Sequence, residues 1–172
     1  TGDSNYVEIT ENGGASYAAQ ALPANASIAY LKAMYKSADS RLKALPNARF
    51  YVTETIFDGY LDDLEDIQNS GAGNTMINED GQLSLTYRGV PVVKIDIWDR
   101  IISAYENNGT TYNLPNRAVL TVASNIPVGT LADGDFGTVD AFFDRYNKVN
   151  VIDGVYTIDA KHLETYLTVA AY

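Results

Sequence analysis

The segment NASIAYLKAMYKSADSRLKALPN, residues 25–47, is the longest amphipathic stretch of the chain. Its apolar residues recur at spacings of three and four: Ile28, Leu31, Tyr35, Ala38, Leu42 and Leu45. This spacing puts them on one narrow stripe of an α-helix. Asn25 or Ser27 can cap its start, and Pro46 ends it because proline disfavours the α conformation in the preceding residue. The sequence therefore predicts one helix over residues 27–45, roughly 28 Å long, whose stripe is buried against a sheet. A coiled coil is the alternative, but fewer than three heptads is short for one.

Strands and shorter helices alternate around this helix. Alternating or β-branched apolar residues predict strands over residues 6–10, 48–54, 82–87, 90–95, 117–124 and 164–172. Arg88-Gly89 joins two of these strands by a turn, and Asp153-Gly154 is the strongest hairpin signal in the chain. The mixed order indicates an α+β fold, with a long helix packed on a mixed or antiparallel sheet and short helices beside it.

Three further helical segments are expected. The first begins after Thr53 or Thr55, and its inward residues are Ile56, Phe57, Tyr60, Leu61, Leu64 and Ile67. The second is capped by Asp96, with Ile97, Ile101 and Tyr105 inward, and the third is short and covers residues 139–146. Residues 68–75 form a flexible loop, and residues 124–138 are irregular.

Composition excludes several classes of function. The 172 residues suffice for one domain, or one domain with a small appendage. The net charge of −10 argues against binding to nucleic acid or to an anionic membrane surface. The chain has no cysteine and a single histidine, which excludes disulfides, thiolate chemistry and multi-histidine metal sites. It opens TGDSNYVEIT, without a visible signal peptide, which says little about a longer parent protein.

Acidic residues and His162 are the first candidates for chemistry. Asp62, Asp63, Glu65 and Asp66 cluster in the second helix. They alternate with inward leucines, which indicates a solvated outer face rather than a pair of acids converging in a cleft. His162 has Asp159 and Glu164 nearby, but the chain has no GxSxG elbow for a serine nucleophile. A structural or surface histidine is the favoured interpretation.

Glycine-rich and acidic turns offer weaker signals. The segment GAGNTM, residues 71–76, lacks the third glycine of a dinucleotide fingerprint and follows a helix. Asn78, Asp80 and Gly81, and the pair Asp133 and Asp135, lack the remaining ligands of a calcium loop. The glycosylation patterns at Asn25 and Asn108 are taken as chance matches. No catalytic, cofactor-binding or metal-binding residue is therefore predicted, and no enzyme activity. The 13 tyrosines favour a protein that binds protein.

Several segments, taken in order, resemble one family. They are AYLKAMYKSADSRLKALPNARFYVT, IFDGYLDDL, LTYRGVPVVKIDIWD and LPNRAVLTVASNIPVGT, followed by Asp159–Lys161 and the terminal LTVAAY. Together they are similar to the major capsid proteins of tailed bacteriophages and prophages with the Hong Kong 97 capsid fold. The most telling pieces are residues 87–94 and 116–130, and the resemblance covers most of residues 26–172.

The resemblance implies a division of the chain. Residues 1–23 would be an extended lead-in, and residues 24–52 and 147–172 a peripheral-type domain with the spine helix and the long hairpin. Residues 53–146 would be an axial-type α/β domain, whose loops meet around five- and six-fold axes. The family's N-terminal arm and extended loop, which carries the cross-linking lysine in some members, are mostly missing. The chain therefore resembles the C-terminal core of a longer subunit, and no catalytic residue is carried over.

Three functional hypotheses follow. The first is a structural subunit of a virion shell, assembled in the cytoplasm of a bacterial host, whose partners are copies of itself in pentamers and hexamers. The isolated chain would then be a monomer or a weak oligomer, since the clasping segments are missing and like-charged copies repel. The second is an acidic surface-binding module, an adhesin or carbohydrate-binding domain. The third is a hydrolase with an acid pair, which would need two carboxylates in a pocket, one with a raised pKa.

Overall fold

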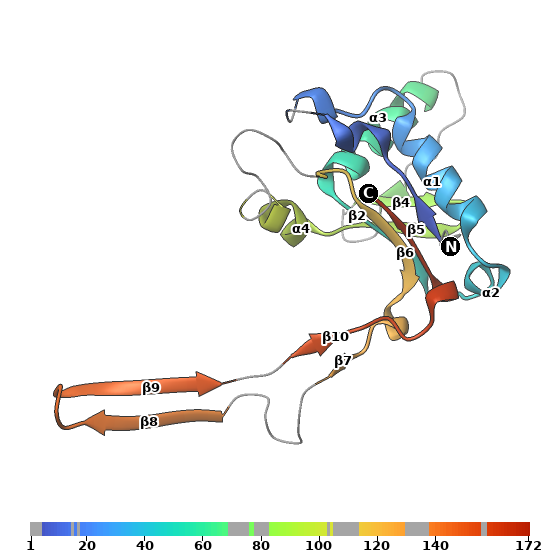
Figure 1. Cartoon of the computed structure of the whole chain (residues 1–172). Helices are drawn as coiled ribbons and strands as arrows, with labels where there is room; N and C mark the ends of the chain where they lie inside the picture. Colours follow the sequence, from blue (N-terminus) through green and yellow to red (C-terminus); the bar gives the residue numbers. More distant parts are fainter. Residues whose placement is uncertain are drawn as a thin grey trace. The chain divides into compact units, whose positions relative to one another are not determined.

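A computed structural model describes residues 5–14, 16, 18–68, 76–77, 83–102, 104, 114–129, 138–155 and 158–172. The chain forms two compact units (Figure 1). The first comprises residues 1–123 and 164–172, and the second residues 124–163. In the described residues, no helix is both long enough and apolar enough to cross a membrane.

A mixed sheet forms the centre of the first unit. Its strand order is β1-β11-β6-β2-β5-β4-β3. The strands are β1 Tyr6–Val7, β2 Ala48–Val52, β3 Met76–Ile77, β4 Leu83–Tyr87, β5 Val90–Lys94, β6 Ala118–Val122 and β11 Thr168–Ala171. β1 pairs in parallel with β11 and β2 with β5, and the other pairs are antiparallel. The predicted α+β class is confirmed.

The helices of this unit are α1 Ala26–Ser37, α2 Ser40–Lys43, α3 Glu54–Gln68 and α4 Asp96–Ile101. Short 3-10 turns occupy η1 Thr10–Gly13, η2 Ala18–Gln20 and η5 Thr165–Leu167. α1 packs against α3 and β11, and α3 against β5, so both helices cover one face of the sheet. The core between them includes Leu31, Met34, Leu42, Phe50, Val52, Ile56, Leu85, Leu120 and Val169, each at most 1% exposed.

The predicted single helix over residues 27–45 is wrong in one respect, because it is broken in two. Ala38 is extended, with φ −63° and ψ 141°, and Asp39 then starts α2 by accepting a hydrogen bond from the Arg41 amide at 2.8 Å. An aspartate and a serine in sequence compete for the backbone and favour a helix start over a helix interior. The stripe is nevertheless buried at Leu31, Ala38 and Leu42, whereas Leu45 is exposed.

The start of α1 is also capped differently from the prediction. Asn25 occupies the cap position with φ 65°, and its side chain makes no capping bond. Asp63 of α3 does this instead: its carboxylate accepts from the Asn25 amide at 2.5 Å and from the Ile28 amide at 3.3 Å. A carboxylate at this end also interacts favourably with the helix dipole. Asp63 is thus buried, and its predicted place on the solvated outer face is wrong.

The β4–β5 hairpin confirms the turn predicted at Arg88-Gly89. Both residues have positive φ, 50° and 81°, as a two-residue type I′ turn requires. The second helix is confirmed as α3, with Ile56 and Tyr60 buried. The short helix α4 forms, but the predicted inward face is wrong: Ile97 and Ile101 are exposed, whereas Ile102 just beyond α4 is buried. Asp96 lies inside α4, and Ile95 holds the cap position.

The described residues of the second unit form two antiparallel strand pairs after a 3-10 turn, η4 Ala123–Asn125, at the boundary. β7 Val128–Gly129 pairs with β10 Asp159–Ala160, so part of the segment expected to be irregular is a strand. β8 Thr138–Asp144 pairs with β9 Val149–Val155. The helical segment expected over residues 139–146 is therefore wrong, because the β-branched and aromatic residues of the two paired strands outweigh a weak helical spacing.

The turn of this hairpin also differs from the prediction. Asp153-Gly154 lies within β9, and the chain reverses over Arg145–Lys148. Asp144 holds that turn by accepting from the Tyr146 amide at 2.8 Å and from the Asn147 side chain at 2.7 Å. Hydrogen bonds from the Asn147 side chain and from the backbone amides of Tyr146 and Asn147 lower the pKa of the Asp144 carboxyl. Lys148 completes the reversal with φ 54°.

The division into peripheral and axial domains stays a prediction. In the sequence, the boundaries between the two observed units fall at residues 123–124 and 163–164. The resemblance places its domain boundaries near residues 23, 52 and 146. Of the loop expected over residues 68–75, Gln68 is the last residue of α3, and residues 69–75 lie outside the described residues. The turn at residues 78–81 and the acids at 133 and 135 lie outside them as well. So does the glycosylation pattern at residues 108–110.

Candidate functional site: an acidic cleft and an exposed hairpin

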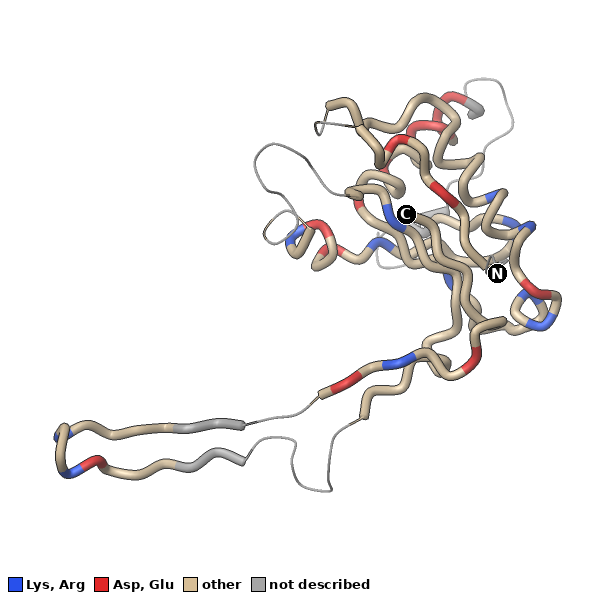
Figure 2. Tube along the Cα trace, in the orientation of Figure 1, with Lys and Arg blue, Asp and Glu red and all other residues tan. Residues whose placement is uncertain are grey.

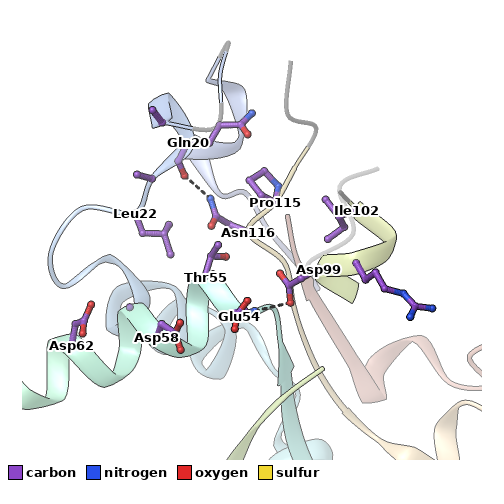
Figure 3. Close-up of a pocket in the computed structure, with 14 residues that line it drawn as sticks. Gln20, Leu22, Glu54, Thr55, Asp58, Asp62, Asp99, Ile102, Pro115 and Asn116 are labelled. Atoms are coloured by element: carbon purple, nitrogen blue, oxygen red, sulfur yellow. Dashed lines mark hydrogen bonds between the residues drawn. The ribbon is translucent and has the colours of Figure 1, made fainter. Parts of the chain in front are cut away.

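A cleft of about 610 Å³ opens in the first unit, between η2, the start of α3 and α4 (Figure 3). Four acids line it, three from α3 and one from α4: Glu54, Asp58, Asp62 and Asp99. Among the residues of the lining that the structure describes, Arg100 is the only basic one. Asp58 and Asp62 are exposed and lie one helical turn apart, so their carboxylates share one face of α3.

Buried amides form one wall of the cleft. Asn12 and Asn116 exchange hydrogen bonds, with the Asn12 side chain donating to the Asn116 carbonyl at 2.7 Å. The Asn116 side chain donates in turn to the Gln20 carbonyl at 2.8 Å. The Gln20 amide nitrogen donates to the carbonyls of Asn12 and Gly14. This network fixes the segment before α1 against the start of β6, and thereby fixes the shape of the cleft.

Two of the four acids already have structural partners. The Asp99 carboxylate accepts from the Glu54 amide at 3.0 Å, and so caps α3. The Glu54 carboxylate accepts from Lys94 Nζ at 3.2 Å, and Lys94 also contacts Asp96 at 3.2 Å. Asp58 and Asp62 have no such partner in the part of the chain that the structure describes, so these two cleft acids are available to a ligand.

The cleft raises the pKa of two carboxyls. Burial is the main cause of the raised pKa of Asp58, and the nearby charges of Glu54 and Asp62 add to it. Burial also raises the pKa of Asp99, against the lowering effect of the Glu54 amide. Burial and neighbouring negative charge both disfavour ionisation of a carboxyl. The cleft thus concentrates negative charge, and a cation entering it would relieve the repulsion.

The chemistry available to this arrangement is limited. The described residues contain no group of three or more histidine, cysteine, aspartate or glutamate side chains placed to hold a metal. Asp99 is committed to capping α3. The described part of the lining offers no histidine or lysine to act as a base. The cleft is therefore better suited to binding a basic group than to general acid–base catalysis.

The other sequence candidates do not gather at one place. Glu65 and Asp66 are exposed on α3, as predicted, while Asp63 is buried under α1. His162, Asp159 and Glu164 are exposed, and His162 and Asp159 belong to the second unit. Glu54, Asp58 and Asp99 were not singled out from the sequence. Asp99 lies 37 residues beyond Asp62, and no local pattern relates the two elements.

An apolar groove of about 250 Å³ lies on the other side of α4, in the same unit. Its lining comprises Trp98, Ile101, Ile102, Arg117, Ala118, Val119, Ala170, Ala171 and Tyr172. Ile102 lines both the groove and the acidic cleft. The α4 segment thus separates an apolar hollow from an acidic one.

The β8–β9 hairpin exposes large apolar side chains. Phe142 and Phe143 are each 56% exposed, Ile152 is 74% exposed and Tyr146 at the turn is 94% exposed. Successive residues of a strand point to opposite faces, so Phe142 and Phe143 put one exposed aromatic ring on each face of the ribbon. The hairpin ends in Arg145 and Lys148 at its turn (Figure 2). A two-stranded ribbon is at best marginally stable in water without a partner.

Comparison with known proteins finds a likeness in fold to a bacteriophage chain. No family model matches the chain, and no curated protein is similar to it in sequence. Its fold resembles that of a chain from Mycobacterium phage Che8, with a TM-score of 0.59 and 13% sequence identity. The match covers 98% of this chain and 53% of the phage chain, so the chain spans about half of the phage chain's length. The fold is thus one that a bacteriophage protein also has.

Proposed function

We propose that the chain is the core of a structural subunit of a phage or prophage capsid shell. The observation that carries the proposal is the fold likeness to the Mycobacterium phage Che8 chain over nearly the whole of this sequence. The exposed apolar faces of the β8–β9 hairpin support it, because contiguous exposed apolar surface marks contact with another protein.

The proposed partners are copies of the subunit itself, in pentamers and hexamers. The site of action is the virion, after assembly in the cytoplasm of the bacterial host. The isolated 172-residue chain would be monomeric or weakly associated, since about half of the length of the similar phage chain has no counterpart in it. Multivalent wrapping contacts raise the effective concentration of each further contact, and fewer contacts mean weaker assembly.

The test is expression of the complete coding sequence that contains this chain in a bacterial host. We expect closed shells or shell fragments by negative-stain electron microscopy, with peptides of this chain as their main component. Recovery of the full-length product only as soluble monomer, at every salt and crowding condition tried, would contradict the proposal.

An acid-pair hydrolase is the second candidate, favoured by the raised pKa values of Asp58 and Asp99 in one cleft. Against it stands the commitment of Asp99 to the α3 cap. Turnover of ester, glycoside or phosphodiester substrates that is lost in Asp58→Asn would favour this second candidate.

A further inference from the structure

The two hollows beside α4 and the β8–β9 hairpin carry matching chemistry. Along the hairpin, apolar residues in the strands give way to a basic turn with an exposed tyrosine. In the first unit, the apolar groove and the acidic cleft are neighbours, because Ile102 lines both. We propose that the β8–β9 hairpin of one copy docks across α4 of a second copy, with its turn in the acidic cleft.

Charge complementarity supports this occupant. The turn presents Arg145 and Lys148, while the Asp144 carboxylate beside them accepts from the turn's own amides. The lining of the cleft, as far as the structure describes it, holds four acids and one base, Arg100. The chain as a whole carries −10, so most of its surface repels a second copy. A basic hairpin turn is an exception, and opposite charge at a docking site selects the register of the contact.

Size and polar chemistry agree with the same occupant. A cavity of about 610 Å³ lies within the range of ordinary binding pockets, and it can admit a tyrosine ring with an adjoining basic side chain. The Oε1 atom of Gln20, a residue 3% exposed, has no hydrogen-bond partner in the described residues, and Gln20 lines the cleft.

Reach is also sufficient. Phe142 lies four residues before Tyr146, which is about 13 Å of extended chain, and an α-helix with its side chains is about 10–12 Å across. The hairpin is therefore long enough to lay Phe142 or Phe143 on the apolar groove while its turn enters the cleft. Burial of an exposed aromatic ring is the favourable step, and the charges set its orientation.

The contact has a definite symmetry. Hairpin and cleft are different surfaces, so each copy both gives a hairpin and receives one. Such head-to-tail contacts close into rings, the smallest of which is a reciprocal dimer, or continue as open chains. The inference deepens the proposed function, since it names the surfaces through which copies of a shell subunit would meet.

The cysteine-free chain allows a direct test by disulfide trapping. Tyr146→Cys is mixed with Ala21→Cys, whose exposed position lines the cleft. The matched control mixes Tyr146→Cys with Ala44→Cys, an exposed alanine outside both hollows. One member of each mixture carries a tag, so that mixed dimers are resolved by size. We expect the cleft pair to cross-link about tenfold faster than the control pair, because docking raises the local thiol concentration.

Charge reversal gives the second readout. Arg145→Glu with Lys148→Glu, in the Tyr146→Cys chain, should slow cross-linking to the cleft by on the order of tenfold, and leave the Ala44→Cys rate nearly unchanged. Salt at 0.5 M should reduce the difference in cross-linking rate between the cleft pair and the control pair, because it screens the attraction between the basic side chains and the acids. Equal rates for the cleft and control pairs, or no effect of charge reversal, would overturn the docking.

Two further outcomes separate this inference from the proposed function. A chain with both Ala21→Cys and Tyr146→Cys that closes an internal disulfide at high dilution would show that the hairpin occupies its own cleft, which overturns docking between copies. Shells that assemble normally with the charge-reversed hairpin would also overturn the docking, but leave the capsid role intact. Trapped head-to-tail oligomers from a full-length protein that never forms shells would support the docking and contradict the capsid role.

Discussion

Removal of the Asp63 carboxylate is expected to destabilise the first unit strongly, although it deletes an acid from a very acidic chain. The carboxylate accepts from two backbone amides at the start of α1, Asn25 N and Ile28 N, and is 4% exposed. Hydrogen bonds to a buried charged group contribute about 1.5–3 kcal/mol, and a charge at the helix end adds about 0.3–1 kcal/mol. Asp63→Ala should therefore cost about 2–4 kcal/mol.

The assay is urea unfolding followed by the fluorescence of Trp98, the single tryptophan, which lies in the same unit. With a slope of about 2 kcal/mol per molar urea, the midpoint of Asp63→Ala should fall by about 1–2 M. Asp63→Asn keeps one acceptor oxygen, but its NH2 group faces the second backbone amide and the charge is lost, so the cost should be about 1–3 kcal/mol.

Glu65→Ala is the matched control, because Glu65 is an exposed acid on the same helix. Its stability should stay within about 0.5 kcal/mol of the wild type. If Asp63→Ala and Glu65→Ala unfold at the same urea concentration, the assignment of Asp63 as the cap of α1 is refuted.

The remaining predictions concern the core, the α1–α3 contact, pH and catalysis. Leu42→Ala should cost about 2–4 kcal/mol, since Leu42 is fully buried, whereas exposed Lys36→Ala should be near neutral; equal urea midpoints would refute the burial of the stripe. Gly59→Ala should destabilise despite the better helix propensity of alanine, because its Cβ would lie 2.6 Å from Ser27 Oγ, and adding Ser27→Ala should recover the loss in a double-mutant cycle. Hydrogen bonds from Arg41 lower the pKa of Asp39 to about 2. The contribution of Asp39 to stability is therefore present above pH 3.8 and is lost as the pH falls toward 2. Thermal melts in acid should show that Asp39→Asn loses less stability between pH 3.8 and 2 than the wild type does. Burial raises the pKa of Asp99, so the folded state binds its proton more tightly, and stability falls as the pH rises from 3.8 through the raised pKa; Asp99→Asn should flatten that slope in thermal melts. The chain should turn over no ester, glycoside or phosphodiester in steady-state assays, and hydrolysis abolished by Asp58→Asn would contradict this.

The candidate surfaces were hidden from the sequence for different reasons. The cleft acids come from α3 and α4, which are distant in sequence, and Asp58 looks like any other acid on an outer helix face. Phe142 and Phe143 were assigned to a helix because eight residues of mixed spacing favour neither structure clearly. The signal that favours a hairpin is Asp144 followed by Asn147, a turn pair whose hydrogen bonds only the folded structure displays.

The sequence by itself determined the class of the fold and most of its strands. These features depend on signals that act over a few residues: the spacing of apolar residues, β-branched runs and turn pairs such as Arg88-Gly89. Such signals can be recognised in the sequence without knowledge of the fold. Only the tertiary structure decided that Asp63 caps α1, and that four acids and an apolar groove meet beside α4. Each of these depends on residues far apart in the chain, whose burial and hydrogen bonds exist only once the sheet has brought them together.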